Sequence, residues 1–470
     1  MNHHDDPYMR HTDAFTWYME SDPLLRSTIV SVAVLDRHPD LDRLMERAER
    51  ASRMSPGFRH TVVHSPWRLA NPRWVVDADF DVRYHARHLA VPPPGTLEQV
   101  YEFACQTGMS GFDRARPLWE FTLIDGIDGD RAALVMKLHH SLTDGVGGME
   151  MAKYLFDIEP NAQLLGPMPD APAGVRLSSR DLTRDALRHR ITRAAGLSAG
   201  AVRSGGAAAW QLLRHPRAAV RDGAGLLGSV ARTVRPVTTT LSPVMRDRRL
   251  SWRYGSLAVP LDALRGSARA AGLTLNDAFL GAVSGGLLQY HERHGSTVDQ
   301  LRVTMPISVR RADDPIGGNR ITLMRFTIPT NVPDPVERMR AIDARCLAAR
   351  HEPAIPYTNA IAGALNVLPR SFVGDMLKHV DFVASNVPGI DVPVYLAGAH
   401  VDEWYAFGPT IGAAMNVTLV SYDGTCYVGV TVDTAAIPDA ETMLECLQDG
   451  FREIIDLRAG DTSHSATQGL

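Results

Sequence analysis

Two adjacent histidines and a nearby aspartate are the residues of this sequence best suited to acid–base chemistry. They lie in the segment Leu-His-His-Ser-Leu-Thr-Asp-Gly at residues 138–145. A neutral imidazole, whose pKa is near ~6.5, accepts a proton at neutral pH and can return it later in the same reaction. The segment therefore predicts a general base that acts on a hydroxyl or thiol group. The alternative is a hydrogen-bonded histidine pair that only closes a strand.

The residues around the histidines predict a strand that ends in a tight turn. Residues 131–138 form an apolar run of strand length, and the glycines at 145, 147 and 148 permit a turn into a helical pattern at 149–158. Catalytic side chains often lie where a strand gives way to a loop. The position of the histidines is therefore consistent with a catalytic role.

The two histidines are expected to have different roles. Neighbouring side chains of a strand point to opposite faces, so His139 and His140 cannot both face one pocket or readily chelate one metal ion. We therefore expect one imidazole to act, the other to support it, and no metal to bind. Asp144 lies four residues after His140, but the glycines that follow argue against a helical pairing. Asp144 is therefore expected to fix the turn rather than to relay a proton.

The bulk composition indicates a large soluble globular protein. A chain of 470 residues is too long for one ordinary core, and its hydrophobic fraction of 45% is normal. The four cysteines lie far apart without a Cys-x-x-Cys pair, and the polar N-terminus lacks a signal-peptide pattern. The longest uncharged stretch, residues 404–422, is interrupted by glycines and a proline, so it does not predict a membrane-spanning helix. These features favour a cytoplasmic location.

A strongly basic segment divides the sequence. Residues 176–253 contain 16 arginines, no lysine and four aspartates, although the whole chain has a formal net charge of -4. The segment follows a proline-rich stretch, which is typical of a domain exit. We therefore expect an N-terminal lobe at residues 1–165, an arginine-rich helical connector at 166–250 and a C-terminal lobe at 251–470.

The connector also has amphipathic parts, because Leu226, Val230 and Val234 repeat at helical spacing. Two interpretations remain open. The connector could bind peripherally to an anionic membrane or a lipid droplet, or it could be a solvated linker that packs its narrow apolar stripe on a lobe. Nucleic-acid binding is not expected, because no recognised nucleic-acid-binding motif accompanies the charge.

Strand and helix patterns alternate on both sides of the connector, which predicts an α/β fold with two lobes of similar size. The expected strands are residues 27–35, 119–124, 131–138, 301–309, 321–328, 416–422 and 426–432. The expected helices, besides that at 149–158, are residues 97–106, 276–293, 335–349 and 440–457.

Three further strings accompany the histidine segment. They are Asp-Arg-Ala-Arg-Pro-Leu-Trp-Glu at residues 113–120, Leu-Asn-Asp-Ala at 275–278 and Ser-Asn-Val-Pro-Gly at 385–389. In this order, the four strings resemble those of the bacterial wax ester synthase/acyl-CoA:diacylglycerol acyltransferase family, one of the acyltransferases with an HHxxxDG motif. The resemblance implies two chloramphenicol-acetyltransferase-like lobes with an active-site channel between them.

The same resemblance implies a role for each residue of the histidine segment. His140 corresponds to the general base, and His139 would support it. Asp144 would hold the loop through an ion pair, for which Arg310 and Arg311 are the candidates. Backbone amides, with that of Gly145 as a candidate, would stabilise the developing oxyanion.

The remaining strings have structural as well as functional interpretations. Residues 117–119 predict a rigid turn and a core tryptophan rather than a substrate contact. Asn276 and Asp277 predict a helix N-cap and a first-turn acid, with substrate binding by Asn276 as the lesser alternative. Ser385 and Asn386 belong to a string with turn composition, and the resemblance implies that they also line the channel and bind substrate.

The activity implied by the resemblance is transfer of a long acyl chain from acyl-CoA, as co-substrate, to diacylglycerol or a fatty alcohol. No other cofactor is expected. The absence of a Gly-x-Ser-x-Gly string fits direct transfer without a covalent serine intermediate. The alternatives are a condensation-type acyltransferase that uses a carrier-protein thioester and a non-catalytic lipid-binding protein. The sequence leaves open the acceptor alcohol, the acyl chain length and the oligomeric state.

Overall fold

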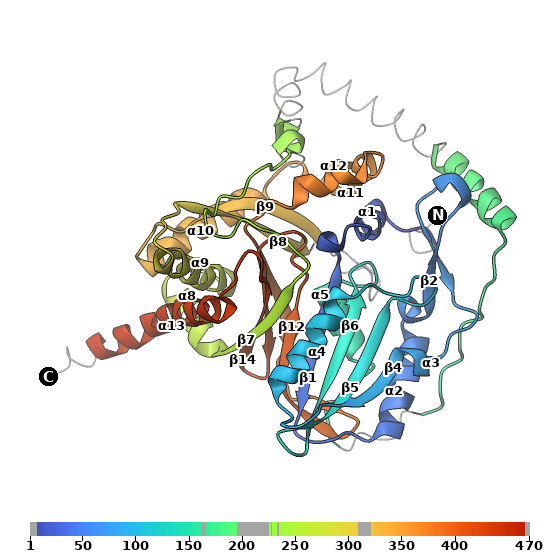
Figure 1. The fold of residues 1–470 in the computed structure, drawn as a ribbon, viewed down its shortest axis with the longest axis horizontal. Coiled ribbons are helices and arrows are strands. Elements are labelled where there is room, and N and C mark those ends of the chain that lie inside the picture. The colour runs from blue at the N-terminus through green and yellow to red at the C-terminus, as the bar shows by residue number, and fades with distance from the viewer. Residues whose placement is uncertain are drawn as a thin grey trace.

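Two six-stranded sheets dominate the described part of the chain, and helices pack around them to form two lobes side by side (Figure 1). This is the two-lobed α/β arrangement expected from the sequence. The computed structural model describes residues 7–160, 166–194, 225–226, 228–232, 235–308 and 321–465.

The sheet of the first lobe is mostly antiparallel, and only β4 and β5 run parallel. In sheet order its strands are β11 (Tyr395–Leu396), β12 (Ala399–Phe407), β1 (Thr28–Leu35), β6 (Arg131–His139), β5 (Trp119–Ile127) and β4 (Ala86–Ala90). The helices of this lobe are α1 (His11–Met19), α2 (Leu41–Met54), α3 (Val82–His85), α4 (Leu97–Met109) and α5 (Gly145–Ala152). Short elements complete it: η2 (Pro23–Leu25), η3 (Pro56–Arg59), η4 (Pro66–Arg68) and the ribbon β2 (His60–Val63) with β3 (Arg73–Val76).

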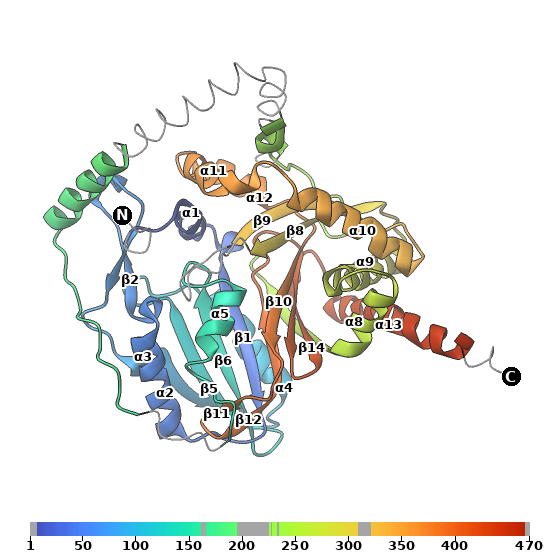
Figure 2. The same ribbon diagram turned by 180° about the vertical axis from the view of Figure 1, so that it is seen from behind.

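The sheet of the second lobe mixes parallel and antiparallel pairs. In sheet order its strands are β7 (Trp252–Pro260), β14 (Thr425–Asp433), β13 (Met415–Tyr422), β10 (Phe382–Ile390), β8 (Gln300–Ser308) and β9 (Ile321–Pro329). A helical layer packs on it, formed by α8 (Leu261–Ala270), α9 (Leu275–Arg293), α10 (Pro335–Arg350) and α13 (Ala440–Ser465). The elements η5 (Ile355–Tyr357), α11 (Thr358–Leu365) and α12 (Arg370–Leu377) lie near α1 instead (Figure 2).

Helix starts follow the local capping chemistry. Thr96 forms a capping box with Gln99 before α4, and Thr274 forms the same arrangement with Asp277 before α9. Each box satisfies backbone N–H groups that have no partner inside the helix. Apolar residues on the inner faces then bury the helices against one large core in each lobe.

A strand from the C-terminal half of the chain completes the first sheet. β12 pairs antiparallel with β1, with Val30 opposite Phe407, and it also packs against β13 and β14 of the second lobe. The chain therefore leaves the second sheet after β10 and returns to it at β13. This exchange, which the sequence analysis did not anticipate, ties the two sheets together.

The predicted connector is described only at its two ends. Residues 179–194 are helical and lie against the first lobe, where Arg73 and Asp185 form an ion pair of 2.8 Å. Residues 235–250 run along the second lobe, and residues 195–224 and Val234 lie outside the described residues. No helix in the described part of the chain combines the length and the apolar character needed to span a bilayer.

Candidate active site

The two histidines lie at the end of β6, in the position expected from the sequence. The N–H of His139 donates to the carbonyl of Leu118 at 3.1 Å, and the N–H of His140 donates to the carbonyl of Ser27 at 2.9 Å. The flanking strands β5 and β1 thus fix the backbone on both sides. A rigid backbone at this point restricts where each imidazole can lie.

The imidazole of His139 is fully buried and held in one tautomer. The N–H of Ser141 donates to its Nδ1 at 3.0 Å, so Nδ1 is an acceptor in the neutral ring and the proton lies on Nε2. Nε2 lies 3.3 Å from Oε1 of Glu20. The edges of Trp17 and Phe112 close the remaining space, at ring-centroid distances of 5.8 and 5.9 Å. This enclosure leaves His139 no access to a substrate.

Glu20 belongs to the site, although the sequence analysis did not identify it. Burial raises the pKa of its carboxyl, but the close contact with Nε2 of His139, the hydrogen bond from the Ser27 N–H and nearby Arg114 hold the pKa below its ordinary value. A carboxylate that stays ionised at neutral pH therefore faces the supporting histidine. Nothing in the spacing between Glu20 and the histidines, which are 119 and 120 residues away, could have revealed this contact.

The imidazole of His140 is partly exposed, unlike that of its neighbour. Its Nδ1 is buried and has no hydrogen-bond partner of normal geometry among the described residues, although the backbone of Thr143 lies close enough to raise the pKa. Because Nδ1 is buried, Nε2 is the candidate atom for accepting a proton. Burial, with a smaller contribution from the adjacent His139, lowers the pKa of His140 to about 4, against the opposing effect of Asp144. At neutral pH the ring is an unprotonated base.

Asp144 fixes the turn that follows the histidines. It is the N-cap of α5, and its buried Oδ1 accepts the N–H of Gly147 at 2.8 Å. The helix therefore begins at Gly145 and ends at Ala152, so the prediction of a helix at residues 149–158 was wrong. The cap explains the early start, because it satisfies a first-turn amide. The proposed partners of Asp144, Arg310 and Arg311, lie outside the described residues.

The structure brings the histidine segment and the Ser-Asn-Val-Pro-Gly string together. A Cβ atom on Gly145 would lie 2.8 Å from Cγ2 of Val387, and α5 packs on β10. Ser385 and Asn386, both half-buried, lie on the same strand just before this contact. The two motifs therefore lie in contact, although they belong to different lobes.

The prediction that this string forms a turn was wrong. Ser385 pairs with Thr418 and Asn386 with Leu419 in the parallel ladder between β10 and β13. These ladder bonds outweigh the turn composition, since strand formation depends strongly on the partner strand. The glycine of the string is required by packing, because a Cβ on Gly389 would lie 1.5 Å from the carbonyl oxygen of Ser421.

Asn276 lies in the first turn of α9, in the second lobe. The N-cap of α9 is Thr274, whose N–H is accepted by Asp277 at 2.9 Å, so the prediction of Asn276 as N-cap was wrong. The three-residue spacing of a threonine and an acid at 274 and 277 fits a capping box better. Because α9 packs on α8, α10 and α13, the substrate-binding role of Asn276 stays a prediction.

The Pro-Leu-Trp part of the first string is structural, as predicted. Trp119 is fully buried, its indole N–H donates to the carbonyl of Phe58 at 2.8 Å, and its ring stacks on His85 at 4.4 Å. Leu118, also fully buried, supplies the carbonyl that holds His139. This string therefore anchors the strand beside the histidines.

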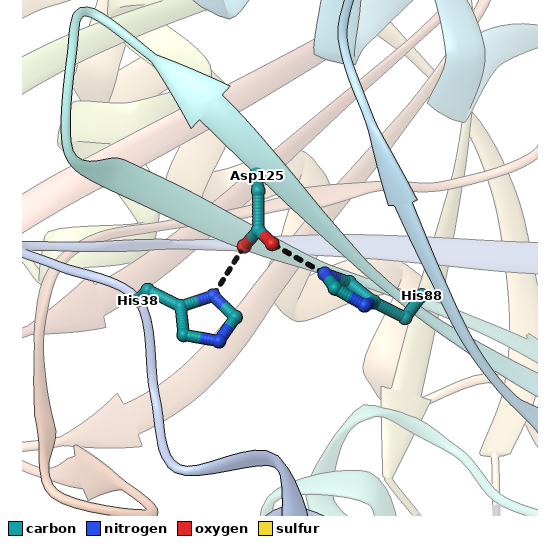
Figure 3. Close-up of side chains that lie close together, drawn as sticks. All are labelled: His38, His88 and Asp125. Carbon is teal, nitrogen blue, oxygen red and sulfur yellow. Dashed lines mark hydrogen bonds and ion pairs between the residues drawn. The ribbon is translucent and has the colours of Figure 1, made fainter.

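One group of side chains in the described residues could hold a metal ion, and it is separate from the histidine pair. His38 and His88 converge on the carboxylate of Asp125 (Figure 3), which lies on β5. Nδ1 of His38 lies 2.7 Å from Oδ1, and Nε2 of His88 contacts Oδ2. Each imidazole already has a carboxylate partner, so the cluster is satisfied as a hydrogen-bonded network.

Comparisons with known proteins agree with this architecture. The wax ester synthase/diacylglycerol acyltransferase catalytic domain matches residues 9–279, and the C-terminal domain of the same family matches residues 317–455. A Mycobacterium tuberculosis H37Rv protein named putative diacylglycerol O-acyltransferase is 36% identical over 446 residues, covering 94% of this chain and 90% of that protein. A second protein of that name and organism is 29% identical over 468 residues, covering 94% and 96%.

Solved structures show the same fold. The wax ester synthase/diacylglycerol acyltransferase from Marinobacter aquaeolei VT8 superposes with a TM-score of 0.62 and 22% identity, covering 96% of this chain and 100% of that chain. The first condensation domain of the calcium-dependent antibiotic synthetase gives a TM-score of 0.60 at 14% identity, covering 96% and 95%. These matches confirm the predicted two-lobed fold. The chain therefore belongs to the wax ester synthase/diacylglycerol acyltransferase family.

Proposed function

We propose that this protein transfers a long acyl chain from acyl-CoA to the hydroxyl group of diacylglycerol or a fatty alcohol, with His140 as the general base. The observation that carries the proposal is the partly exposed, unprotonated imidazole at the junction of β6 and α5. The names of the relatives, which specify diacylglycerol acyltransferase and wax ester synthase, support this choice of acceptors.

In the proposed mechanism, Nε2 of His140 accepts the hydroxyl proton while the alcohol oxygen attacks the thioester carbonyl. A C–O bond forms, and the carbonyl becomes a tetrahedral oxyanion. Collapse of the oxyanion breaks the C–S bond, and His140 returns the proton to the thiolate, which leaves as free coenzyme A. Base assistance of this kind contributes ~10²- to 10⁴-fold in rate.

The N-terminus of α5 is the proposed site for the oxyanion. Asp144 already accepts the N–H of Gly147 through its side chain and that of Gly148 through its carbonyl. The N–H of Gly145 is the proposed donor to the oxyanion. Helix N-termini favour negative charge, and a fixed donor is most effective where charge develops.

His139 is a positioning residue in this mechanism. Ser141 and Glu20 hold its two ring nitrogens, which fixes the backbone bend that presents His140. Its position beside His140 also contributes to the low pKa of that residue. A base with a low pKa is weaker, but it is fully available at neutral pH.

Thiol release from palmitoyl-CoA tests the proposal. Wild-type protein should release thiol when dioleoylglycerol or hexadecanol is present, and His140→Ala should lose most of this acceptor-dependent release. His88→Ala is the matched control, because His88 is a surface histidine that is distant from His140 in the sequence. A folded His140→Ala variant with near-normal turnover would refute the role of His140. Release from a carrier-protein thioester but not from palmitoyl-CoA would favour the condensation-type alternative.

We further propose that the protein binds peripherally to lipid surfaces through the end of the molecule around α1 (Figure 2). α11 packs on α1, and the guanidinium of Arg193 in the connector helix lies 2.7 Å from Nε2 of His11 in α1. Exposed apolar side chains gather on these neighbouring segments: Leu187, Ile191, Val367, Leu368 and Phe372.

Arginines accompany these apolar side chains on the connector helix, so both charge and burial would favour an anionic bilayer. Val367→Asp should weaken sedimentation with anionic phosphatidylserine vesicles, and added salt should weaken it further. Val392→Asp, at another exposed valine, is the control. Equal binding of wild type and Val367→Asp would rule out this surface.

A further inference from the structure

A basic cavity lies in the second lobe, outside the histidine site. Its volume is about 740 Å³, and its lining residues come from α10, the neighbouring strands β8 and β9, and the returning connector. Its charged lining consists of Arg232, Arg235, Arg302, Arg325, Arg345 and Glu352. Five cations and one carboxylate around one cavity indicate a site for an anion.

The hydrogen bonds show that backbone carbonyls hold several of these guanidinium groups. Arg302 donates to the carbonyls of Thr239 and His379, at 2.9 and 3.0 Å, and Arg325 donates to the carbonyl of Arg235 at 2.8 Å. Such contacts orient a guanidinium group without neutralising its charge.

One carboxylate, that of Glu352, lies among the described residues that line the cavity. Glu352 binds Arg232 through two hydrogen bonds of 3.0 Å, and buried Asp381 lies near Arg302 while accepting three backbone N–H groups. No carboxylate in the described part of the chain forms an ion pair with Arg235 or Arg345, both of which are exposed.

The electrostatic environment of Arg325 reflects this excess of positive charge. Burial lowers the pKa of its guanidinium, and the neighbouring charge of Arg302 lowers it further. Like charges at a partly buried site destabilise each other, and a bound anion would remove that cost. Among the described residues that line it, the cavity therefore carries more positive than negative charge.

An apolar pocket of about 230 Å³ adjoins the basic cavity. The two share Arg232, Arg325, Ala349 and Glu352 in their linings. The rest of the pocket lining is mostly apolar, with Leu323, Leu377 and Ile411 among its residues, and its polar members are Thr304, Thr322 and Thr358. A ligand that fills both spaces must be charged at one end and apolar beyond it.

The apolar pocket approaches the histidine site from the second lobe. Leu377 and Ile411 pack in a small cluster with Met19 and Leu25. Met19 directly precedes Glu20, whose carboxylate faces His139. The basic cavity, the apolar pocket and the histidine site thus follow one another through contacting residues.

We propose that the basic cavity binds the phosphate groups of an amphiphilic ligand, whose less polar part enters the adjoining apolar pocket. Arginine suits this role because its planar fork binds phosphate oxygens in pairs and stays charged. Two sources offer this chemistry, acyl-CoA and phosphatidate. The number of arginines favours acyl-CoA, which carries three phosphate groups, and that assignment rests on the proposed function.

Binding measurements on the full-length protein test the site independently of turnover. The probes are coenzyme A, pantetheine (which lacks all three phosphates), dioctanoyl phosphatidate and inorganic phosphate. Arg235→Ala and Arg345→Ala should each weaken coenzyme A binding about tenfold, the effect of losing one charge-assisted contact, and pantetheine binding should not change. Arg345→Lys should recover part of the affinity.

Arg350→Ala is the matched control, because Arg350 is exposed on the same helix but does not line the cavity. Its affinity for coenzyme A should match that of wild type within about twofold. Loss of phosphatidate binding alone in the two cavity variants would support the phosphate site with phosphatidate as the source. Unchanged binding of both coenzyme A and phosphatidate in the Arg235→Ala/Arg345→Ala double variant would overturn the proposal.

The outcomes also separate this proposal from the proposed function. Arginine-dependent binding in a protein that shows no acyl transfer would leave the phosphate site intact and refute the transferase activity. The opposite outcome is a double variant that still transfers acyl groups, with unchanged KM for palmitoyl-CoA and unchanged affinity for coenzyme A. That outcome would refute the phosphate site and leave the transferase activity intact. Weaker binding of inorganic phosphate in the double variant would show that the cavity recognises the anion itself.

Discussion

The contact between Gly145 and Val387 predicts how the two lobes are coupled at the active site. In Gly145→Ala, the new Cβ would lie 2.8 and 2.9 Å from the two methyl groups of Val387, closer than side-chain atoms normally approach. Overpacking of this kind typically costs about 1–3 kcal/mol of folding free energy. The substitution should therefore lower the unfolding temperature and shift the N-terminus of α5, which reduces acceptor-dependent thiol release.

Gly148→Ala is the matched control on the same helix. A Cβ at Gly148 would meet only a methyl group of Thr143, at an ordinary distance of 3.8 Å. Because alanine restricts the unfolded chain more than glycine does, this variant should be neutral or stabilised by up to about 1 kcal/mol.

A double-mutant cycle completes this test. Val387→Ala removes both clashing methyl groups, so Gly145→Ala should cost less in the Val387→Ala background by about 1–3 kcal/mol. Urea unfolding of the four proteins measures this coupling. Additive effects, or equal stability of Gly145→Ala and Gly148→Ala, would refute the inferred contact between the two motifs.

Three further predictions concern the histidines and the strand that supports them. Because the pKa of His140 is lowered to about 4, kcat/KM should stay nearly constant as the pH falls from 7 to 5. At pH 5 a base of pKa ~6.5 would be about 30-fold less available. A reversible fall of kcat/KM to half its maximum near pH 6.5 would contradict the lowered pKa. Glu20→Ala should destabilise the protein by about 1–3 kcal/mol more than Glu20→Gln, which can still pair with Nε2 of His139; equal urea midpoints would argue against that pairing. Trp119→Ala should lower the free energy of unfolding by about 3–5 kcal/mol, since it empties a fully buried site and leaves the Phe58 carbonyl without its donor. A loss below about 1 kcal/mol would contradict this expectation and show that neighbouring residues fill the emptied space.

Local pattern was sufficient to predict the elements with strong apolar periodicity. The strand expected at residues 131–138 became β6, and the helix expected at 335–349 became α10, each within one residue of its bounds. The position of the histidine pair at the end of β6 followed from this. Such elements are predictable because burial of a continuous apolar face determines them.

Features that depend on distant partners were not predictable. The strand character of residues 385–389 comes from pairing with β13, and the position of β12 comes from pairing with β1. Glu20 joins the site only because α1 and η2 fold across the end of β6 near His139. Nothing in the local sequence of these segments identifies their partners, since cross-strand and tertiary contacts override composition.

The exchange of β12 into the first sheet also constrains how the chain can fold during synthesis. Until β12 has left the ribosome, β1 has β6 on one side and an open row of backbone donors and acceptors on the other. Exposed strand edges of this kind pair readily with other chains. The first lobe of the nascent chain therefore keeps one sheet edge unprotected until residues near 407 have been synthesised. A fragment that stops at residue 250 would keep that edge and should aggregate, although it contains the whole histidine segment.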